Sequence, residues 1–285
     1  MKIAILSDIH NFRGVYKGSI TKSTAKEIGL DNYDFSFLEL SSKEKKELSN
    51  VDVFILAGDI SEHISYSDWI HRFEEEIKTF NKKDFDLLSI PGNHDYYECG
   101  INQLQLYFSS NEIPTPIKST YIHKTYDGVS IIGTTLWSPP NKPECYRLTD
   151  YYYIPYFSKD DNGNCKNVLK VYKREKKWLI NTVNKEKELH PKNKIIVFSH
   201  HAPLSCLIPD KYKNVETSYL NGCFANMNEK DNKEYLSLPI DIWIYGHTHE
   251  NRDEIINGIR FISNQRGYSS EPEIYNNFKP KIIEI

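Results

Sequence analysis

The chain has 285 residues, a length that fits one or two globular domains. Hydrophobic residues make up 39% of it and charged residues 26%, a balance that argues against a disordered chain. The 36 Lys and Arg residues against 39 Asp and Glu residues give a net charge of -3. Composition therefore offers no support for non-specific binding to nucleic acid, which needs a strong basic excess.

Short apolar runs, each followed at once by Asp, His, Asn or Gly, recur along the chain. Runs of this length that are rich in Ile, Val and Phe and bounded by turn residues predict buried strands. They are Ile3–Leu6, Val51–Ala57, Phe85–Ile90, Ile195–Phe198 and Ile240–Tyr245.

Helical spacing of apolar residues lies between these runs. It predicts helices at Trp69–Phe80 and Val168–Val183, and a shorter one at Ile101–Phe108. Strands that alternate with helices indicate right-handed crossovers and a largely parallel sheet. Asp127-Gly128 and Asn257-Gly258 each divide two strand-like runs, as in hairpins with type I′ turns.

The predicted fold class is therefore mixed α/β. We expect one domain over residues 1–285, with polar excursions at about 12–50, 138–167 and 204–237. The five cysteines are odd in number and have no C-x-x-C spacing, which argues against a disulfide framework or a zinc knuckle. No stretch of about 18 apolar residues occurs, so we expect no membrane association and a soluble cytoplasmic protein.

The polar residues after the predicted strands are the candidate functional site. Because ligand sites in open α/β sheets lie at the carboxyl ends of strands, these residues should converge in space. Two carboxylates, one amide oxygen and four imidazoles are more than one metal ion needs and suit two ions with open positions. The candidate ligands are Asp8, His10, Asp59, Asn93, His200, His247 and His249.

In chain order, the blocks read D-x-H, G-D, G-N-H-D, H-H-x-P and G-H-x-H. This series resembles the calcineurin-like metallophosphoesterase superfamily. The resemblance runs from Asp8 to His249 and implies a four-layer α/β/β/α sandwich, in which helices flank two packed mixed β-sheets. The G-D block is not followed by Arg, and the third block ends in Asp95 where the protein phosphatase branch has Glu. The resemblance is thus to members outside that branch.

The resemblance also implies two metal sites that share one ligand. One ion would be held by Asp8, His10 and His249, the other by Asn93, His200 and His247, and Asp59 would bridge them. A hydroxide that bridges the ions would attack phosphorus, and His94 would protonate the leaving alkoxide as general acid. Asp95 would orient His94 through a carboxylate–imidazole hydrogen bond.

Three further features keep two interpretations each. His201 either contacts substrate or only packs beside His200. Arg266 either reaches a phosphate or forms a structural ion pair. The aromatic segment Tyr146–Phe157 is either a flap that stacks on a planar group or a loop that folds over apolar surface, and we favour the loop.

These patterns predict a metal-dependent phosphoric ester hydrolase, either a phosphodiesterase or a phosphatase. The expected substrate is a small phosphate ester or a nucleotide. The expected cofactors are two metal ions, with Mn or Fe favoured and Zn or Ni accepted by the same donor set. The alternatives are a non-catalytic scaffold with this fold and a nuclease of the same superfamily. Oligomeric state and physiological substrate cannot be read from these motifs.

Overall fold

The computed structural model describes residues 1–10, 40–61, 63–97, 121–157 and 166–285. Their strands form two sheets, one in the order β10-β1-β2-β3 and one in the order β4-β5-β6-β7-β9-β8. The first sheet contains β1 (Lys2–Leu6), β2 (Val53–Ala57), β3 (Asp86–Ile90) and β10 (Lys281–Glu284). The second contains β4 (Tyr121–Tyr126), β5 (Val129–Thr134), β6 (Lys194–Ser199), β7 (Ile242–Tyr245), β8 (Asp253–Ile256) and β9 (Ile259–Ser263).

Parallel pairing dominates both sheets, as the strand–helix alternation predicts. In the first sheet β1, β2 and β3 are parallel, and β10 joins β1 antiparallel. In the second, β5, β6, β7 and β9 are parallel, and the edge strands β4 and β8 are antiparallel partners from the two predicted hairpins. Every strand predicted from an apolar run is confirmed, whereas β10 carried no prediction.

The two sheets pack face to face because their side chains alternate. Along β1, Ile3 and Ile5 lie in the core between the sheets, whereas Ala4 and Leu6 lie in the core toward the helices. Along β6, Phe198 faces the first sheet and Val197 faces the opposite way. These strands are therefore buried on both sides and read as continuous apolar runs.

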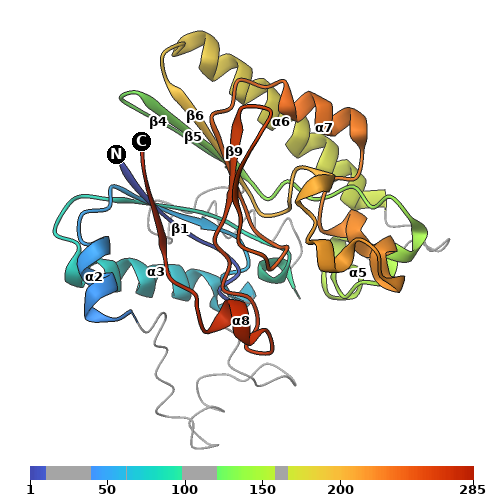
Figure 1. Cartoon of the computed structure of the whole chain (residues 1–285), viewed down its shortest axis with the longest axis horizontal. Coiled ribbons are helices and arrows are strands. Elements are labelled where there is room, and N and C mark those ends of the chain that lie inside the picture. Colours follow the sequence, from blue (N-terminus) through green and yellow to red (C-terminus); the bar gives the residue numbers. More distant parts are fainter. Residues whose placement is uncertain (11–39, 62, 98–120, 158–165) are drawn as a thin grey trace, which may run out of the picture.

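Helices cover the outer faces of both sheets (Figure 1), which completes the predicted four-layer sandwich. Helices α2 (Ser42–Leu48) and α3 (His63–Phe80) lie on the first sheet, and α6 (Lys166–Leu189) and α7 (Glu229–Leu236) lie on the second. Two shorter helices are α5 (Asp150–Tyr153) and α8 (Pro272–Tyr275). No helix among the described residues is long and apolar enough to cross a membrane. The helix predicted at Ile101–Phe108 and residues 12–39 of the first excursion lie outside the described residues.

Short 3-10 helices occupy the loop after β3 and the second and third excursions. They are η1 (His94–Tyr96), η3 (Pro143–Arg147), η4 (Pro155–Phe157), η5 (Ser205–Leu207), η6 (Asp210–Tyr212) and η7 (Glu216–Cys223). The second and third excursions pack on each other: Cys145 Sγ donates to the carbonyl of Tyr219 at 3.4 Å, and Cys223 Sγ to that of Cys145 at 3.7 Å. Figure 1 shows α5 beside the third excursion.

The aromatic segment Tyr146–Phe157 mainly packs, as we expected. Tyr151, Ile154 and Phe157 are buried in the core that also contains α3. Tyr152 and Tyr153 are exceptions, with 64% and 38% of their surfaces exposed. The segment thus anchors its excursion to the body of the molecule.

Candidate metal centre

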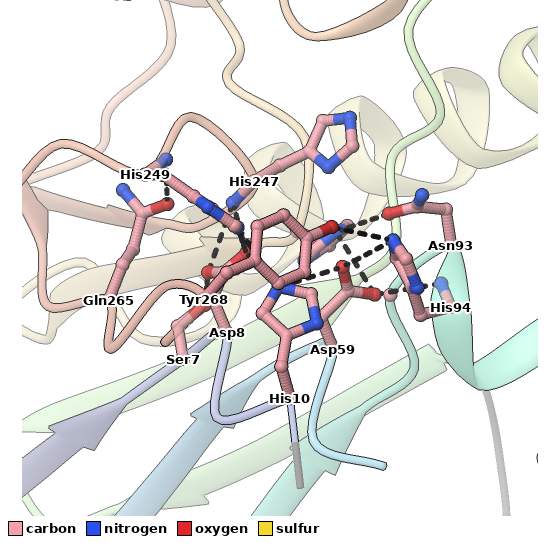
Figure 2. A network of polar contacts seen from close by, with 12 residues as sticks. Ser7, Asp8, His10, Asp59, Asn93, His94, His247, His249, Gln265 and Tyr268 are labelled. Carbon is pink, nitrogen blue, oxygen red and sulfur yellow. Dashed lines mark hydrogen bonds and ion pairs between the residues drawn. The ribbon is translucent and has the colours of Figure 1, made fainter. Parts of the chain in front are cut away.

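The seven candidate ligands meet at the carboxyl ends of five strands, and Figure 2 labels all of them except His200. Asp8 and His10 follow β1, Asp59 follows β2 and Asn93 follows β3. His200 follows β6, and His247 and His249 follow β7. Ligand atoms lie within 4.8 Å of one another in the groups Asp8–His10–His249, His10–Asp59–His94 and Asp59–His200–His247.

The backbone at these positions is unusual. A positive φ is uncommon for residues other than glycine, and clusters of such residues are typical of functional sites. Five of the seven candidate ligands have a positive φ. The φ values are 51° at Asp8, 44° at His10, 53° at Asp59, 70° at His247 and 48° at His249.

Two motif glycines make room for the ligands. A Cβ atom on Gly92 would lie 2.2 Å from Asp59 Oδ1 and 2.7 Å from the His200 ring. A Cβ on Gly246 would lie 2.6 Å from Asp8 Oδ2. All three distances are far below van der Waals contact, so the blocks G-N-H-D and G-H-x-H need glycine for space.

One half of the site is formed by Asp8, His10 and His249. The Nε2 atoms of His10 and His249 are 2.9 Å apart, and His249 Nε2 is 3.4 Å from Asp8 Oδ1. The other ring nitrogen of His249, Nδ1, lies 2.5 Å from Glu271 Oε2. A carboxylate behind a ligand histidine fixes its tautomer and leaves the opposite nitrogen free to face a metal ion.

The other half is formed by Asn93, His200 and His247. His200 Nδ1 donates to the carbonyl of Ala57 at 3.0 Å, which directs Nε2 into the site, 2.9 Å from Asn93 Oδ1. The amide of Asn93 is oriented in turn, because its Nδ2 donates to Asp150 Oδ1 at 2.9 Å. The oxygen of Asn93 therefore faces the site.

Asp59 lies between the halves. Its Oδ1 is 3.5 Å from His200 Nε2, and its Oδ2 is 3.7 Å from His10 Nε2. Its Oδ1 also accepts the backbone N–H of His94 at 2.9 Å. One carboxylate oxygen thus faces each half of the site.

The buried groups differ in charge: one carboxylate is ionised and two imidazoles are neutral, as cation binding requires, whereas the pKa values of His200 and His249 are raised by neighbouring carboxylates. Burial alone would raise the pKa of Asp59, but the nearby His200 and His94 lower it well below its usual value, so the carboxylate is ionised. Burial lowers the pKa values of His10 and His247, which keeps both rings neutral. Burial opposes a charge on His200 as well, yet Asp59 raises the pKa of His200 to about 9.

The orphaned nitrogen of His247 provides a direct test of fit. Its Nε2 atom is buried and has no hydrogen-bond partner within the described parts of the chain. Such a group is costly to bury unless something binds it. The same residue belongs to the group Asp59–His200–His247, whose donors are the mixed N and O set that first-row transition metals accept. The residues present therefore fit a metal ion.

His94 stands beside this cluster, and 16% of its side chain is exposed. Its Nε2 is 4.0 Å from Asp59 Oδ2 and 3.0 Å from the hydroxyl of Tyr268. In Figure 2 the Tyr268 ring lies across His10, and their ring centroids are 4.3 Å apart.

The prediction that Asp95 orients the His94 ring is wrong. Asp95 is fully buried, and its carboxylate accepts the backbone N–H groups of Asp59 (2.8 Å), Ser61 (2.9 Å) and Gly92 (2.7 Å). It therefore ties the loop after β2 to the loop after β3. The physical reason is the bend at η1, which directs consecutive side chains to different surroundings.

The two candidate substrate contacts lie off the cleft, as far as the described residues define it. His201 is buried against His247 and Trp137, with ring centroids 4.4 and 4.8 Å away, so packing is its observed role. The guanidinium of Arg266 stacks on Tyr275 and donates to its hydroxyl at 2.8 Å.

A cleft of about 360 Å³ opens onto the site. Asp59, Asn93, His94, His247 and His249 form its floor. Its walls come from the second and third excursions and from the segment around Tyr268. The second excursion thus reaches the cleft through Leu148, Thr149 and Asp150, which belong to the aromatic segment Tyr146–Phe157.

Three side chains at the candidate site carried no prediction from the sequence: Glu271, Asp150 and Tyr268. Asp150 lies within the aromatic segment and Tyr268 lies two residues after Arg266, but neither belongs to a motif. Glu271 lies in a loop before α8, and only the tertiary structure brings it to His249.

A two-sheet sandwich that carries such a site at its strand ends is typical of the metallophosphoesterase fold. The chain belongs to the calcineurin-like phosphoesterase family, whose model matches residues 1–251, so the resemblance seen in the motifs is confirmed. The chain is 32% identical over 252 residues to an uncharacterized protein of Acanthamoeba polyphaga mimivirus, with 83% of this chain and 84% of the viral protein covered. The structure of phosphopantetheinyl hydrolase from Mycobacterium tuberculosis is similar in fold, with a TM-score of 0.56 and 15% identity over 99% of this chain and 95% of that one.

Proposed function

We propose that the protein is a phosphoesterase that works with two metal ions. The observation that carries the proposal is the position of Asp59, which directs one carboxylate oxygen toward each of two ligand groups. In this proposal Asp8, His10 and His249 hold one ion, Asn93, His200 and His247 hold the other, and Asp59 bridges them. When bound, the ions supply positive charge for the phosphoryl oxygens and a water of lowered pKa as nucleophile.

His94 is the proposed general acid. It lies at the floor of the cleft beside Asp59, so it can reach a leaving-group oxygen there. An alkoxide is a poor leaving group, and a positioned acid typically contributes about 10²–10⁴-fold to the rate. Asp95 is a positioning residue in this scheme, because it holds the backbone of Gly92 and Asp59 on either side of the site.

The same geometry gives less support to the two alternatives, a nuclease and a non-catalytic scaffold. A nuclease needs cations that bind a phosphate backbone, yet no Lys or Arg lines the described walls of the cleft. A non-catalytic scaffold has no need for the strained backbone and the orphaned nitrogen of His247. We therefore favour an enzyme over both alternatives.

The proposal also covers domain organisation, cellular location and metal identity. We take the chain as one domain, since β1 and β10, from its two ends, pair in one sheet. We expect a cytoplasmic location, since Cys206 and Cys223 are free thiols. We favour Mn or Fe over Zn or Ni for a mixed N and O site, a choice that metal supply decides more than affinity.

The test compares His94→Ala with wild type on two monoesters, p-nitrophenyl phosphate and phenyl phosphate, with Mn²⁺ added. Because phenolate is the poorer leaving group, loss of the acid should cost about 10²–10⁴-fold on phenyl phosphate and much less on the nitrophenyl ester. His71→Ala is the matched control, since His71 is exposed on α3. Bis-p-nitrophenyl phosphate in the same assay reports diesterase action.

Metal analysis decides between enzyme and scaffold. Wild-type protein incubated with Mn²⁺ and desalted should retain about two ions per chain. Protein that binds no metal and hydrolyses none of these esters would contradict the proposed function. Equal effects of His94→Ala on both monoesters would contradict only the role of His94 as acid.

A further inference from the structure

The walls of the cleft differ in character from its floor. Above the candidate ligands, the third excursion contributes Ile208, Pro209, Tyr212, Leu220 and Phe224 to the lining, and the second contributes Leu148. These side chains are apolar or aromatic. An apolar cavity with a few polar groups at one end is the usual form of a site for a small molecule.

These walls are built into the fold. Ile208 is buried in the core of the second sheet, and Phe224 stacks on the ring of His247 with centroids 4.8 Å apart. Asn221 lines the same wall, and its Nδ2 donates to the carbonyl of Tyr212 at 3.0 Å, which ties η7 to η6. The apolar surface is therefore held in place, continuous with the metal-binding floor.

The charge of the cleft is one-sided. Its described lining contains Asp59, Asp150 and Glu271 but no Lys or Arg. Two cations lie beside lining residues without lining the cleft themselves: the Nζ of Lys211 is 4.8 Å from the centroid of the Tyr212 ring, and the guanidinium of Arg252 donates to the carbonyl of Ile208 at 3.5 Å. A phosphoryl group seated on two metal ions is compensated by them, whereas a second anionic group in this cleft would meet carboxylates and apolar side chains.

We propose that the cleft selects esters with one phosphoryl group on a small, uncharged, apolar or aromatic alcohol. This inference rests on the proposed function and specifies its substrate class. The volume of about 360 Å³ suits this class, because it lies near the lower end of the range of ligand pockets, about 300–1,000 Å³. Polyphosphates and acidic phosphosugars are excluded by the same walls.

The test uses three aryl phosphates whose leaving groups have nearly the same acidity. They are phenyl phosphate, 4-butylphenyl phosphate and 4-(3-carboxypropyl)phenyl phosphate. Each methylene that enters an apolar wall should raise kcat/KM about fourfold, which corresponds to ~0.8 kcal/mol. We expect the butyl ester to exceed phenyl phosphate by at least about tenfold and the carboxypropyl ester to lose that gain.

Variants locate the effect in the walls. Leu220→Ala should reduce the advantage of the butyl ester over phenyl phosphate about three- to tenfold. Leu189→Ala is the matched control, because Leu189 is 60% exposed at the end of α6. Tyr212→Ser is a second wall variant with the same expectation, should Leu220→Ala fold poorly.

Two results overturn the inference and leave the proposed function intact. One is equal kcat/KM for the three esters with metal-dependent turnover. The other is a higher kcat/KM for the carboxypropyl ester than for the butyl ester, if Lys211→Met abolishes this preference. That result would mean that Lys211 binds a second anionic group of the substrate. Absence of metal-dependent turnover on every ester would instead refute the proposed function itself.

Discussion

Replacing Glu271 by Gln tests whether the carboxylate behind His249 supports a metal ligand. Glu271 Oε2 lies 2.5 Å from His249 Nδ1 and also accepts the backbone N–H of Tyr268 at 2.9 Å. Burial opposes the charge on Glu271, but its hydrogen bond to His249 lowers the pKa of the carboxyl, so it is ionised at neutral pH. Glutamine keeps the shape and removes the charge.

The magnitude follows from the charge that is lost, because the glutamine amide oxygen can still accept a hydrogen bond from His249. A hydrogen bond to a charged group contributes about 1.5–3 kcal/mol and a neutral one about 0.5–1.5 kcal/mol, so the change removes roughly 1–1.5 kcal/mol. With about 1.4 kcal/mol per factor of ten, binding of one metal ion should weaken about tenfold. This lies at the lower end of the effects measured when groups behind a metal ligand are changed, about 10–100-fold.

The assay is titration of metal-free protein with Mn²⁺, read by calorimetry, alongside metal content after dialysis. Glu271→Gln should weaken one of two binding steps and leave the other unchanged, since Glu271 contacts only His249 among the candidate ligands. Glu273→Gln, an exposed neighbour in α8, is the control. Two unchanged steps in Glu271→Gln, or an equal loss in both variants, would refute the reasoning.

Three further predictions address other groups. Asp150→Asn should weaken binding of the ion proposed for Asn93 about 10–100-fold in the same titration, because Asp150 orients the Asn93 amide. If Asp150→Asn instead weakens the binding step that Glu271→Gln weakens, the proposed division of the ligands between two ions is contradicted. Tyr268→Phe removes the hydrogen bond to His94, so kcat should change about 2–10-fold with metal content unaltered; loss of metal would contradict this. Burial raises the pKa of Glu175 to about 8 from an ordinary value of 4.5, so between these pH values the native state holds a proton that the unfolded state has lost. Stability should therefore fall as pH rises through this window, on the order of 1 kcal/mol per pH unit, and urea denaturation of Glu175→Gln should lack that slope.

Much of the fold could be predicted because its strands carry local signals. A strand buried on both faces, such as β2, reads as an unbroken apolar run, and Asn257-Gly258 marks the turn between β8 and β9. β10 escaped prediction because it is an edge strand of four residues, only one of them buried. Its place in the sheet depends on pairing with β1 at the other end of the chain.

The candidate ligands could be predicted for a different reason. They lie at strand ends, and parallel strands bring those ends to one edge whatever the intervening chain does. The supporting groups follow no such rule. Asp150 and Glu271 reach Asn93 and His249 from separate segments, and Asp95 turns away from its neighbour His94 to bind backbone amides.

The same distinction applies to substrate choice. The floor of the cleft is specified by motif residues whose backbone is strained and whose space is provided by glycine. The walls are specified by ordinary apolar residues, such as Leu220 and Ile208, in an excursion that no motif marks. Because such residues also occur throughout the core, only the fold distinguishes a wall from packing. The proposed phosphoesterase reaction can therefore be predicted from sequence motifs. The proposed substrate class can be inferred only from the structure, because it depends on walls that form where the second and third excursions meet above the candidate metal site.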